Sequence, residues 1–371
     1  MPERIRIIAG EVDPLREAIR QEIASSGPIT FARYMELCLY HPRYGYYMRP
    51  RSPRGKAGDY FTSPTVGPLF GKTLARQIAE MADLIPGVFH LVEVGSGEGY
   101  LALDILNALK EEAPEVLRRL HYLSVEINPF MVERQKELLK AFKGLVSWPR
   151  WEETGGIRGC ILANELLDAL PVHRVVLKGG RLKEIFVDLA ESSFCEVPKE
   201  PTRGVSAYFQ WLETLPPEGC QAEAGISALE WLEGASARLA EGFVLLIDYG
   251  HDAKTLLSGA FPQGTLLAYR GHRVHTDFYS APGADDLTAH VNFTAVLKKA
   301  RELGLGTLGP RNQGRFLLAL GILDGLKGRE GERLQARRLI LPGGMGDVFK
   351  VLVLYKAMDS PRLRGFEEVW T

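Results

Sequence analysis

The stretch LVEVGSGEG, residues Leu91 to Gly99, decides the fold of this chain. Its apolar half predicts a buried β-strand, and its glycines let the backbone turn sharply because they carry no Cβ atom. The periodic apolar residues from Tyr100 to Lys110 predict a helix directly after the turn. A strand, a glycine loop and a helix in this order are typical of nucleotide-binding α/β folds.

The spacing of the glycines indicates which ligand the loop binds. A dinucleotide-binding loop has the pattern G-x-G-x-x-G, which requires a glycine where this chain has Tyr100. The chain instead has Glu93 ahead of Gly95 and Gly97. A carboxylate there suits a ligand with an ammonium and a sulfonium charge better than a pyrophosphate. We therefore expect Glu93, Gly95 and Gly97 to bind S-adenosyl-L-methionine; a tight turn without a ligand is the alternative.

Short apolar strands alternate with helices from Phe89 onward. The predicted strands are FHLVEVG, HYLSVEI, GLVSW, GCILANE and GFVLLIDYG. Two later stretches, RFLLALGIL (315–323) and VFKVLVLYK (348–356), are predicted to be strands that close the sheet edge. Near-continuous apolar strands separated by helices indicate a parallel sheet with both faces covered. The predicted fold class is therefore α/β, with a Rossmann-like sheet.

We divide the chain into an N-terminal helical region with a cofactor lid, residues 1–86, and a core, residues 87–371. Stretches at about 172–230 and 253–293 interrupt the alternation. We interpret them as insertions over the carboxyl edge of the sheet, where open α/β sheets bind ligands. Tyr44–Pro64 is rich in aromatic residues and arginines, unlike disordered segments. We expect it to form an ordered lid over the cofactor.

Two further features follow the predicted strands. Glu126 ends HYLSVEI, where a carboxylate can accept hydrogen bonds from both ribose hydroxyls; an exposed charge at a strand end is the alternative. Trp148, Trp151 and Glu152 follow the next strand, where an adenine would contact them. For the tryptophans, an ordinary position in the core or at its rim is an equal alternative.

The fourth strand, GCILANE, ends in Asn164 and Glu165, and Asp168 follows. In this architecture the strand end faces the transferred group, yet the Asn-Pro-Pro-aromatic cluster of methyltransferases that modify flat bases or amides is missing. Carboxylates can instead hold a guanidinium through two parallel hydrogen bonds. We predict that Asn164, Glu165 and Asp168 are catalytic and that Asn164 also contacts the cofactor. Helix capping by Asn164 and Asp168, and an ion pair of Glu165 with an arginine, are the alternatives.

Composition excludes several classes of protein. Lys and Arg total 45 against 46 Asp and Glu, so no global field attracts nucleic acid or an anionic membrane. No apolar run reaches the roughly 18 residues of a membrane span, and the charged N-terminus lacks the apolar core of a signal peptide. The cysteines lie far apart, which indicates reduced thiols in a cytoplasmic protein.

Three histidines and two aspartates lie close together in the sequence: His272, His275, His290, Asp285 and Asp286. Their spacing matches no metal-ligand pattern, and displacement of a methyl group requires no metal. We therefore expect no metal site and interpret this region as a loop ordered by hydrogen bonds.

Eight blocks spread over nearly the whole chain resemble the MidA-type methyltransferases, which include the mitochondrial complex I assembly arginine methyltransferase. The blocks are ITFARYMELCLYHPRYGYY, GDYFTSPTVGPLFG, LVEVGSGEG, ILANELLDALPVHR, LLIDYG, PGADDLTAHVNF, NQGRFLLALG and MGDVFKVLVLYK. The resemblance implies a seven-stranded methyltransferase core with an N-terminal helical region and inserted lid segments. It also implies S-adenosyl-L-methionine as cofactor and symmetric dimethylation of a protein arginine.

The resemblance further implies roles for single residues. By position, Gly95 and Gly97 are cofactor-loop glycines and Glu126 is the ribose ligand. The segment leading into the cofactor site comprises Gly58, Asp59, Thr62, Ser63 and Pro64. The implied partner is a protein that presents an arginine, a respiratory-complex subunit by analogy with the mitochondrial member. Three points stay open: a small molecule or RNA as acceptor, a scaffold protein that retains the fold, and the oligomeric state, including a dimer.

Overall fold

The central sheet of the computed structural model carries the site and is described first. The structure describes residues 13–50, 63–191, 193–326 and 329–368. Seven strands lie in the order β15-β16-β10-β5-β2-β3-β4, and β14 pairs with β10. The neighbours from β4 to β10 are parallel, while β16 is antiparallel to both β10 and β15. The bounds are β2 Phe89–Val94, β3 Leu120–Val125, β4 Val146–Ser147, β5 Ile157–Asn164, β10 Leu239–His251, β14 Val291–Asn292, β15 Gly306–Asn312 and β16 Phe349–Lys356.

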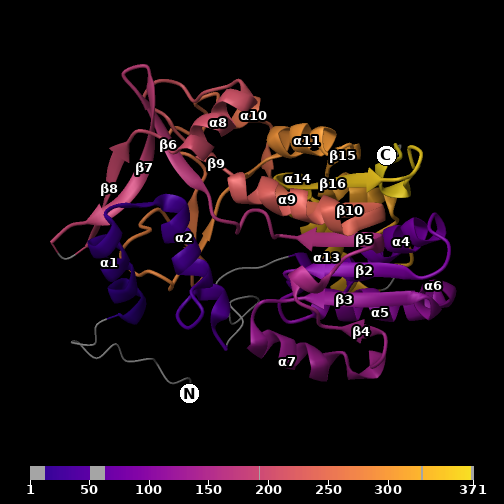
Figure 1. Cartoon of the computed structure of the whole chain (residues 1–371). Helices are drawn as coiled ribbons and strands as arrows, with labels where there is room; N and C mark the ends of the chain where they lie inside the picture. Colours follow the sequence, from indigo (N-terminus) through magenta and orange to yellow (C-terminus); the bar gives the residue numbers. More distant parts are fainter. Residues whose placement is uncertain (1–12, 51–62, 192, 327–328, 369–371) are drawn as a thin grey trace.

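Helices cover both faces of this sheet (Figure 1). On one face, α4 (Leu69–Asp83) and α5 (Tyr100–Glu112) pack against alternate strand residues such as Leu91 and Leu162. On the other face, α9 (Ile226–Arg238) and α11 (Phe293–Glu302) pack against the residues between them, such as Val92. The predicted α/β class and the two covered faces are therefore confirmed, and the sheet is parallel except for the antiparallel strands β15 and β16 at one edge.

One predicted strand is wrong. Residues 315–323, expected to be a sheet-edge strand, belong largely to helix α12, Gln313–Ala319, and the edge strand is β15. Phe316, Leu317 and Leu320 are fully buried while Arg315 and Leu323 are exposed, which is a helical spacing. A short apolar run fits a buried helix as well as a strand, and only the packing partners decide between them. The stretch 348–356 is a strand, β16, as expected.

A second, smaller part lies beside the sheet (Figure 1). Its strands are β1 Ile29–Thr30, β6 His173–Lys178, β7 Arg181–Leu189, β8 Phe194–Lys199 and β9 Gln221–Ala224. They form a sheet in the order β1-β7-β6-β9, with β8 also on β7. Helices α1 (Pro14–Ser26) and α2 (Phe31–Tyr40) share one apolar cluster with this sheet, and the Thr30 hydroxyl caps α2 by accepting the N–H of Arg33 at 3.2 Å. The first of the two predicted insertions and the N-terminal helices thus form one packed unit.

Short elements complete the described chain. They are η1 Tyr46–Met48, α3 Ser63–Val66, α6 Pro114–Arg118, α7 Pro129–Leu138, η2 Lys140–Phe142, η3 Trp151–Glu153, α8 Arg203–Leu212, α10 Ala253–Leu256, β11 Leu267–Arg270, β12 Arg273–His275, β13 Asp286–Thr288, α13 Glu330–Ile340, α14 Met345–Val348 and η4 Arg364–Phe366. In the parts of the chain that the structure describes, no helix has the length and apolar character needed to cross a bilayer.

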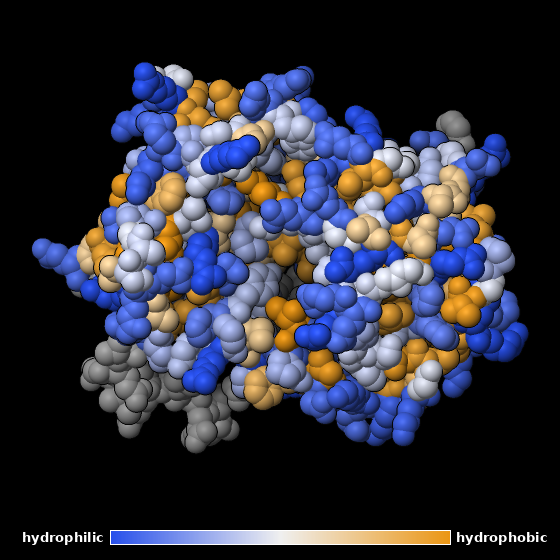
Figure 2. Space-filling view, viewed as in Figure 1, coloured by the Kyte–Doolittle hydropathy of each residue, from blue (hydrophilic) through white to orange (hydrophobic). Residues whose placement is uncertain are grey.

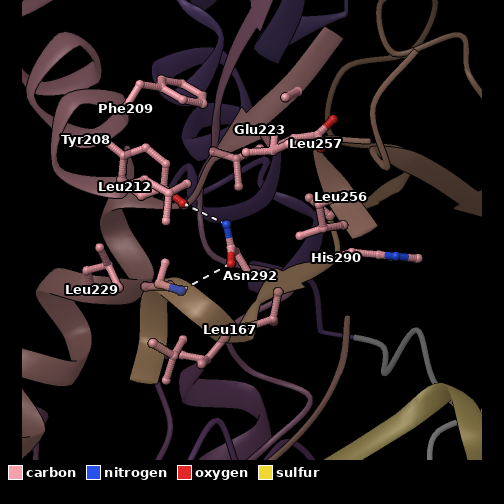
Figure 3. A pocket seen from close by; sticks show the side chains of 18 residues that line it. Leu167, Tyr208, Phe209, Leu212, Glu223, Leu229, Leu256, Leu257, His290 and Asn292 are labelled. Carbon is pink, nitrogen blue, oxygen red and sulfur yellow. Dashed lines mark hydrogen bonds between the residues drawn. The ribbon is translucent and has the colours of Figure 1, made fainter. Parts of the chain in front are cut away.

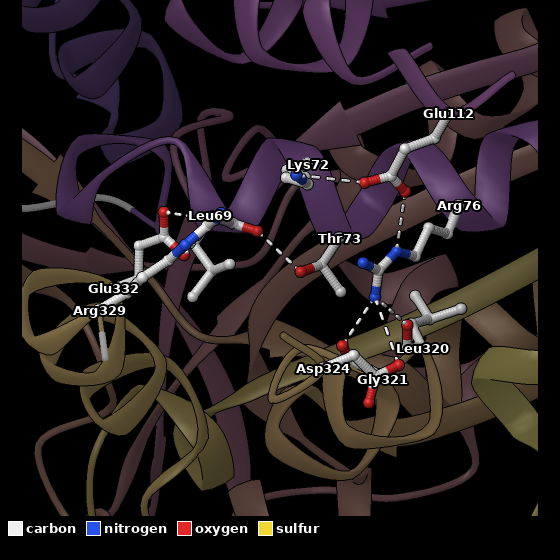
Figure 4. A network of polar contacts seen from close by, with 10 residues as sticks. All are labelled: Leu69, Lys72, Thr73, Arg76, Glu112, Leu320, Gly321, Asp324, Arg329 and Glu332. Carbon is white, nitrogen blue, oxygen red and sulfur yellow. Dashed lines mark hydrogen bonds and ion pairs between the residues drawn. The ribbon is translucent and has the colours of Figure 1, made fainter. Parts of the chain in front are cut away.

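A polar network fastens α4 to its neighbours (Figure 4). The Arg76 guanidinium pairs with Glu112 of α5 at 3.1 Å and donates to the carbonyl oxygens of Leu320 and Gly321 at 2.9 and 2.7 Å. Lys72 also reaches Glu112, at 3.2 Å. Although the sequence division assigns α4 to the N-terminal region, its packing and ion pairs join it to the core.

Glycine is required where the three central strands run side by side. A Cβ atom at Gly159 in β5 would lie 1.9 Å from the carbonyl oxygen of His90 in β2. A Cβ atom at Gly242 in β10 would lie 2.0 Å from the carbonyl oxygen of Gly159. Both glycines also have positive φ angles, 152° and 126°. These strands therefore reach their register only without side chains at the two positions.

We predict that Gly159→Ala lowers the free energy of unfolding by about 3 kcal/mol or more, because backbone atoms cannot yield to the new methyl group. Urea denaturation followed by circular dichroism measures the change. Gly155→Ala is the matched control, because its Cβ atom would meet nothing within 4 Å; its effect should stay within about 0.5 kcal/mol. A Gly159→Ala protein as stable as the wild type would contradict this strand packing.

His290 lies in an aromatic cluster rather than in a metal site. Its ring is 5.4 Å from that of Tyr249, 5.3 Å from that of His251 and 5.6 Å from that of Phe261. Burial, followed by the neighbouring His251, lowers the pKa of His290 from 6.5 to about 4. Among the residues described, no three His, Cys, Asp or Glu side chains are arranged to hold a metal ion.

This cluster makes the stability depend on pH. Because the folded pKa of His290 lies below the unfolded value, the unfolded chain binds a proton first as the pH falls. This contribution of His290 is present above about pH 6.5 and is lost toward pH 4, so it should fall by about 2 kcal/mol between pH 7 and pH 5. His290→Phe keeps an aromatic ring but has no group that binds a proton. Urea denaturation at pH 7 and pH 5 should show that its free energy of unfolding falls by about 2 kcal/mol less than that of the wild type. Equal losses in both proteins would show that His290 is not buried in its neutral form.

Candidate active site

The glycine loop between β2 and α5 has a left-handed backbone at each of its glycines. The φ angles of Gly95, Gly97 and Gly99 are 74°, 59° and 85°. Residues with a Cβ atom rarely adopt such angles, so the glycines are required by the turn itself. The loop is also tied to the next strand, because the backbone N–H of Gly97 donates to the carboxylate of Glu126 at 2.7 Å.

A cavity of about 280 Å³ opens beside this loop. Its wall includes the two glycines Gly95 and Gly97, the strand-end residues Glu126 and Glu165, and Tyr47 from the smaller part. Figure 2 shows the surface hollowed between the two parts of the molecule. The volume is close to the lower end of the roughly 300–1,000 Å³ of small-molecule sites, and the wall is largely apolar with a few convergent polar groups, as is usual there.

A second cavity lies between α8, α9 and α10 and holds no comparable space. Its volume is about 30 Å³, room for about two water molecules at most. Figure 3 shows apolar side chains around Asn292, whose amide donates to the Tyr208 hydroxyl at 3.4 Å. This cavity is therefore a packing gap, and the larger one beside the glycine loop is the candidate active site.

Glu126 is held at the cavity wall by backbone groups. Its carboxylate accepts hydrogen bonds from the N–H groups of Gly97 at 2.7 Å and Asn128 at 2.8 Å. A carboxylate has about four lone-pair directions and can accept more than two hydrogen bonds. Glu126 thus lies on the cavity wall, and its role as ribose ligand stays a prediction.

Glu93 has a different environment. Its side chain is 3% exposed and accepts a hydrogen bond from the Tyr122 hydroxyl at 2.6 Å. Successive strand residues point to opposite faces, so Val94 borders the cavity while Glu93 points toward the helices α4 and α5. The structure therefore does not bring Glu93 to the cavity wall with the other predicted cofactor residues.

Glu165 combines a strained backbone with a place on the cavity wall. Its φ angle is 52°, which costs a residue with a Cβ atom of the order of 1–3 kcal/mol. Its carboxylate accepts hydrogen bonds from the Ser63 backbone at 3.0 Å and from the Asn164 amide at 3.2 Å. Strain of this kind clusters at functional sites, where the surrounding structure maintains it.

The other two predicted catalytic residues lie behind or beside Glu165. Asn164 has a buried side-chain oxygen without a hydrogen-bond partner among the described residues, a free-energy cost that a bound donor would offset. Asp168 is 5% exposed and is not on the cavity wall. The helix-capping alternative is wrong for both, because residues 165–172 form turns and no helix follows β5.

The buried carboxylate of Asp248, from the LLIDYG block, faces the same turn. Its Oδ2 atom accepts hydrogen bonds from the backbone N–H groups of Leu167 at 2.8 Å and Asp168 at 3.3 Å. Burial, and then the nearby charge of Asp168, raises the pKa of Asp248 well above its ordinary value.

The segment ahead of the core is described only in part. Gly58, Asp59 and Thr62 lie outside the described residues, as does most of the predicted lid, and the side chain of Pro64 is not described either. Ser63 begins α3, is fully buried, and donates from its hydroxyl to Gln313 at 3.1 Å.

Several residues of the wall were not predicted from the sequence. Tyr40 and Tyr47 contribute to it from α2 and η1, and the Tyr47 hydroxyl donates to Asp286 at 2.6 Å. Their signal was present in the tyrosine-rich block YHPRYGYY, which starts at Tyr40 and ends at Tyr47. Trp231 of α9 also lines the cavity and lies 6.1 Å from Trp151 with nearly parallel rings. No local sequence pattern links these two tryptophans. The third tryptophan of the prediction, Trp148, is not part of the cavity wall, and its indole N–H donates to the side-chain oxygen of Gln135 at 2.8 Å.

Comparison with known proteins matches this site to one family. A family model described as "Putative S-adenosyl-L-methionine-dependent methyltransferase" matches residues 73–311. The protein arginine methyltransferase NDUFAF7 homolog, mitochondrial, of Drosophila melanogaster is 30% identical, over 96% of this chain and 88% of its own length. The NDUFAF7 of Mus musculus is also 30% identical, over 96% of this chain and 87% of its own length.

A solved structure agrees with the fold. The crystal structure of a protein from Burkholderia thailandensis bound to S-adenosyl-homocysteine has a TM-score of 0.87 and 32% sequence identity. The match covers 95% of this chain and 94% of that protein. The expected cofactor is thus confirmed at the level of the family, since S-adenosyl-homocysteine is S-adenosyl-L-methionine without its methyl group.

The predicted cytoplasmic location is contradicted. The relatives from Drosophila melanogaster, Mus musculus and Homo sapiens are all named as mitochondrial proteins. The prediction was wrong because it rested on unpaired cysteines, which report reducing conditions and do not separate one reducing compartment from another. By fold, glycine loop and relatives, the chain belongs to the MidA-type family of S-adenosyl-L-methionine-dependent methyltransferases.

Proposed function

We propose that this methyltransferase modifies a guanidinium nitrogen of an arginine in a protein. The observation that carries the proposal is the Glu165 carboxylate, which lies on the wall of the cavity at the end of β5. A carboxylate can bind a guanidinium through two parallel hydrogen bonds, a geometry that a lysine ammonium does not match. The relatives named as protein arginine methyltransferases support the same acceptor.

The residues around the cavity fit S-adenosyl-L-methionine, which supplies an electrophilic methyl group when bound. Gly95 and Gly97 allow a close approach of the backbone, and we assign the ribose hydroxyls to Glu126. The buried oxygen of Asn164 is an acceptor suited to an ammonium group. Trp151 and Trp231 give the cavity an aromatic wall that suits an adenine.

Glu165 addresses the main difficulty of the reaction. An arginine nitrogen is a weak nucleophile, because its lone pair is delocalised and the group stays protonated up to about pH 12. A carboxylate paired with two of the nitrogens draws the positive charge toward itself and fixes which nitrogen faces the methyl group. Because the acceptor is already held in place on binding, the methyl transfer itself does not have to order it, which lowers the entropic part of the barrier. The negative charge also stabilises the cationic transition state.

The scaffold alternative is less well supported than an enzyme. A protein that only binds a partner has no need for a glycine loop, a backbone-held carboxylate and a strained Glu165 around one cavity. A small-molecule or RNA acceptor would not require the carboxylate that is matched to a guanidinium. A protein arginine therefore accounts for the largest number of these features.

The test is methyl transfer by the wild type and by Glu165→Gln. Labelled S-adenosyl-L-methionine is incubated with a host-cell protein extract, and mass spectrometry locates the label. We expect label on arginine, as symmetric dimethylarginine if the family analogy extends to the product. Glu165→Gln keeps the size of the side chain but loses its charge, which should cost about 2–5 kcal/mol in the transition state. The rate should then fall roughly thirtyfold to several thousandfold.

Glu213→Gln is the matched control for this experiment. Glu213 is exposed at the end of α8 and also has a left-handed φ angle, 58°, but it is not part of the cavity wall. Its rate should stay within about twofold of the wild type, and binding of S-adenosyl-homocysteine should be similar in all three proteins. Normal turnover of Glu165→Gln, or label on residues other than arginine, would overturn the proposal.

A further inference from the structure

The turn that carries Glu165 is held from the neighbouring strand β10. The Glu165 N–H donates to the carbonyl oxygen of Ile247 at 2.8 Å. Further along the turn, the backbone N–H groups of Leu167 and Asp168 both donate to a side-chain atom, Oδ2 of Asp248. The other oxygen of Asp248, Oδ1, accepts from the N–H of Tyr249 at 2.8 Å. The carboxylate therefore joins the end of β10 to the turn.

The turn needs such a tether because of its conformation. Glu165 adopts a left-handed φ angle at an energetic cost, and no helix follows to continue a regular hydrogen-bond pattern. A backbone carbonyl fixes the first residue of the turn, and the Asp248 side chain accepts the N–H groups of Leu167 and Asp168. The Asp168 carbonyl oxygen is held separately, by the N–H of Ala289 at 3.0 Å. Without these bonds the turn can relax toward an ordinary conformation, which moves the Glu165 carboxylate.

Burying the carboxyl group of Asp248 costs folding free energy, which indicates that a carboxyl group is needed at this position. Asp248 is 1% exposed and lies close to Asp168, which is also buried. Two carboxylic groups in a buried site repel each other when both are ionised, so neither is a favourable core residue. An apolar residue would pack there at less cost but could not accept the two N–H groups.

We propose that Asp248 is a positioning residue for methyl transfer, which holds Glu165 toward the acceptor by binding the backbone of the turn at Leu167 and Asp168. The proposal rests on the proposed role of Glu165. It predicts that Asp248 acts on the rate only through Glu165.

A double-mutant cycle tests this dependence. Asp248→Ala should lower the initial rate of label transfer from S-adenosyl-L-methionine to extract proteins by roughly tenfold to a hundredfold, because small misplacements have effects of that size. Asp248→Asn keeps one oxygen acceptor and should lie between Asp248→Ala and the wild type. In the Glu165→Gln background, Asp248→Ala should change the rate by less than about twofold, because the group it positions is already disabled. Independent, multiplicative losses would overturn the proposal.

A second measurement covers the case in which the variants are merely unstable. In Asp248→Ala, hydrogen exchange should accelerate at the amides of Leu167 and Asp168 while the amide of Ile161 in β5 stays protected. Asp104→Asn, which changes a partly buried carboxylate of α5, is the control and should leave the rate within about twofold. Unchanged exchange at Leu167 and Asp168, or general loss of protection, would contradict the tether.

The cycle and the proposed function can fail separately. The cycle reads total label transferred, whichever residue receives it, whereas the arginine assignment is read from the identity of the labelled residue. Label on another acceptor with a non-multiplicative cycle would reject arginine and keep Asp248 as a positioning residue. Label on arginine with a multiplicative cycle would keep arginine as the acceptor and reject Asp248 as a positioning residue.

Discussion

The close alignment of three parallel strands, β2, β5 and β10, is the constraint on which the site depends. Because parallel strands end at the same edge, this alignment places the glycine loop, the Glu165 turn and Asp248 beside one another. Two glycines, Gly159 and Gly242, make the register sterically accessible at the opposite end. The chemistry of the site therefore depends on packing that contains no reactive group.

The sequence was sufficient for most of this edge. Apolar strands, glycine spacing and strand-end carboxylates are local patterns, and they predicted the positions of Gly95, Gly97, Glu126 and Glu165 on one wall. The position of Glu93 was not predicted correctly. Glu93 directly precedes Val94 in β2, and successive strand residues point to opposite faces of the sheet, so only Val94 borders the cavity. A helix at 313–319 was mistaken for a strand, because its apolar run has no local feature that separates the two.

Other parts of the site follow from contacts between distant segments. Trp231 reaches Trp151 from about 80 residues away, and Tyr47 reaches Asp286 across more than 230 residues. Asp248 belongs to a block that the sequence analysis quoted, but nothing in LLIDYG shows that its carboxylate binds the backbone after β5. The smaller part of the molecule thus completes a cavity whose chemical groups come mainly from the sheet.

The most direct test of this account is a crystal structure of the protein with S-adenosyl-homocysteine. The account predicts that the ribose hydroxyls lie on Glu126, that the nucleoside contacts the wall formed by Trp151 and Trp231, and that the sulfur faces Glu165. Such a placement would put the transferred methyl group beside the carboxylate that is proposed to hold the acceptor. A ligand bound elsewhere, or one whose sulfur faces away from Glu165, would contradict the central claim.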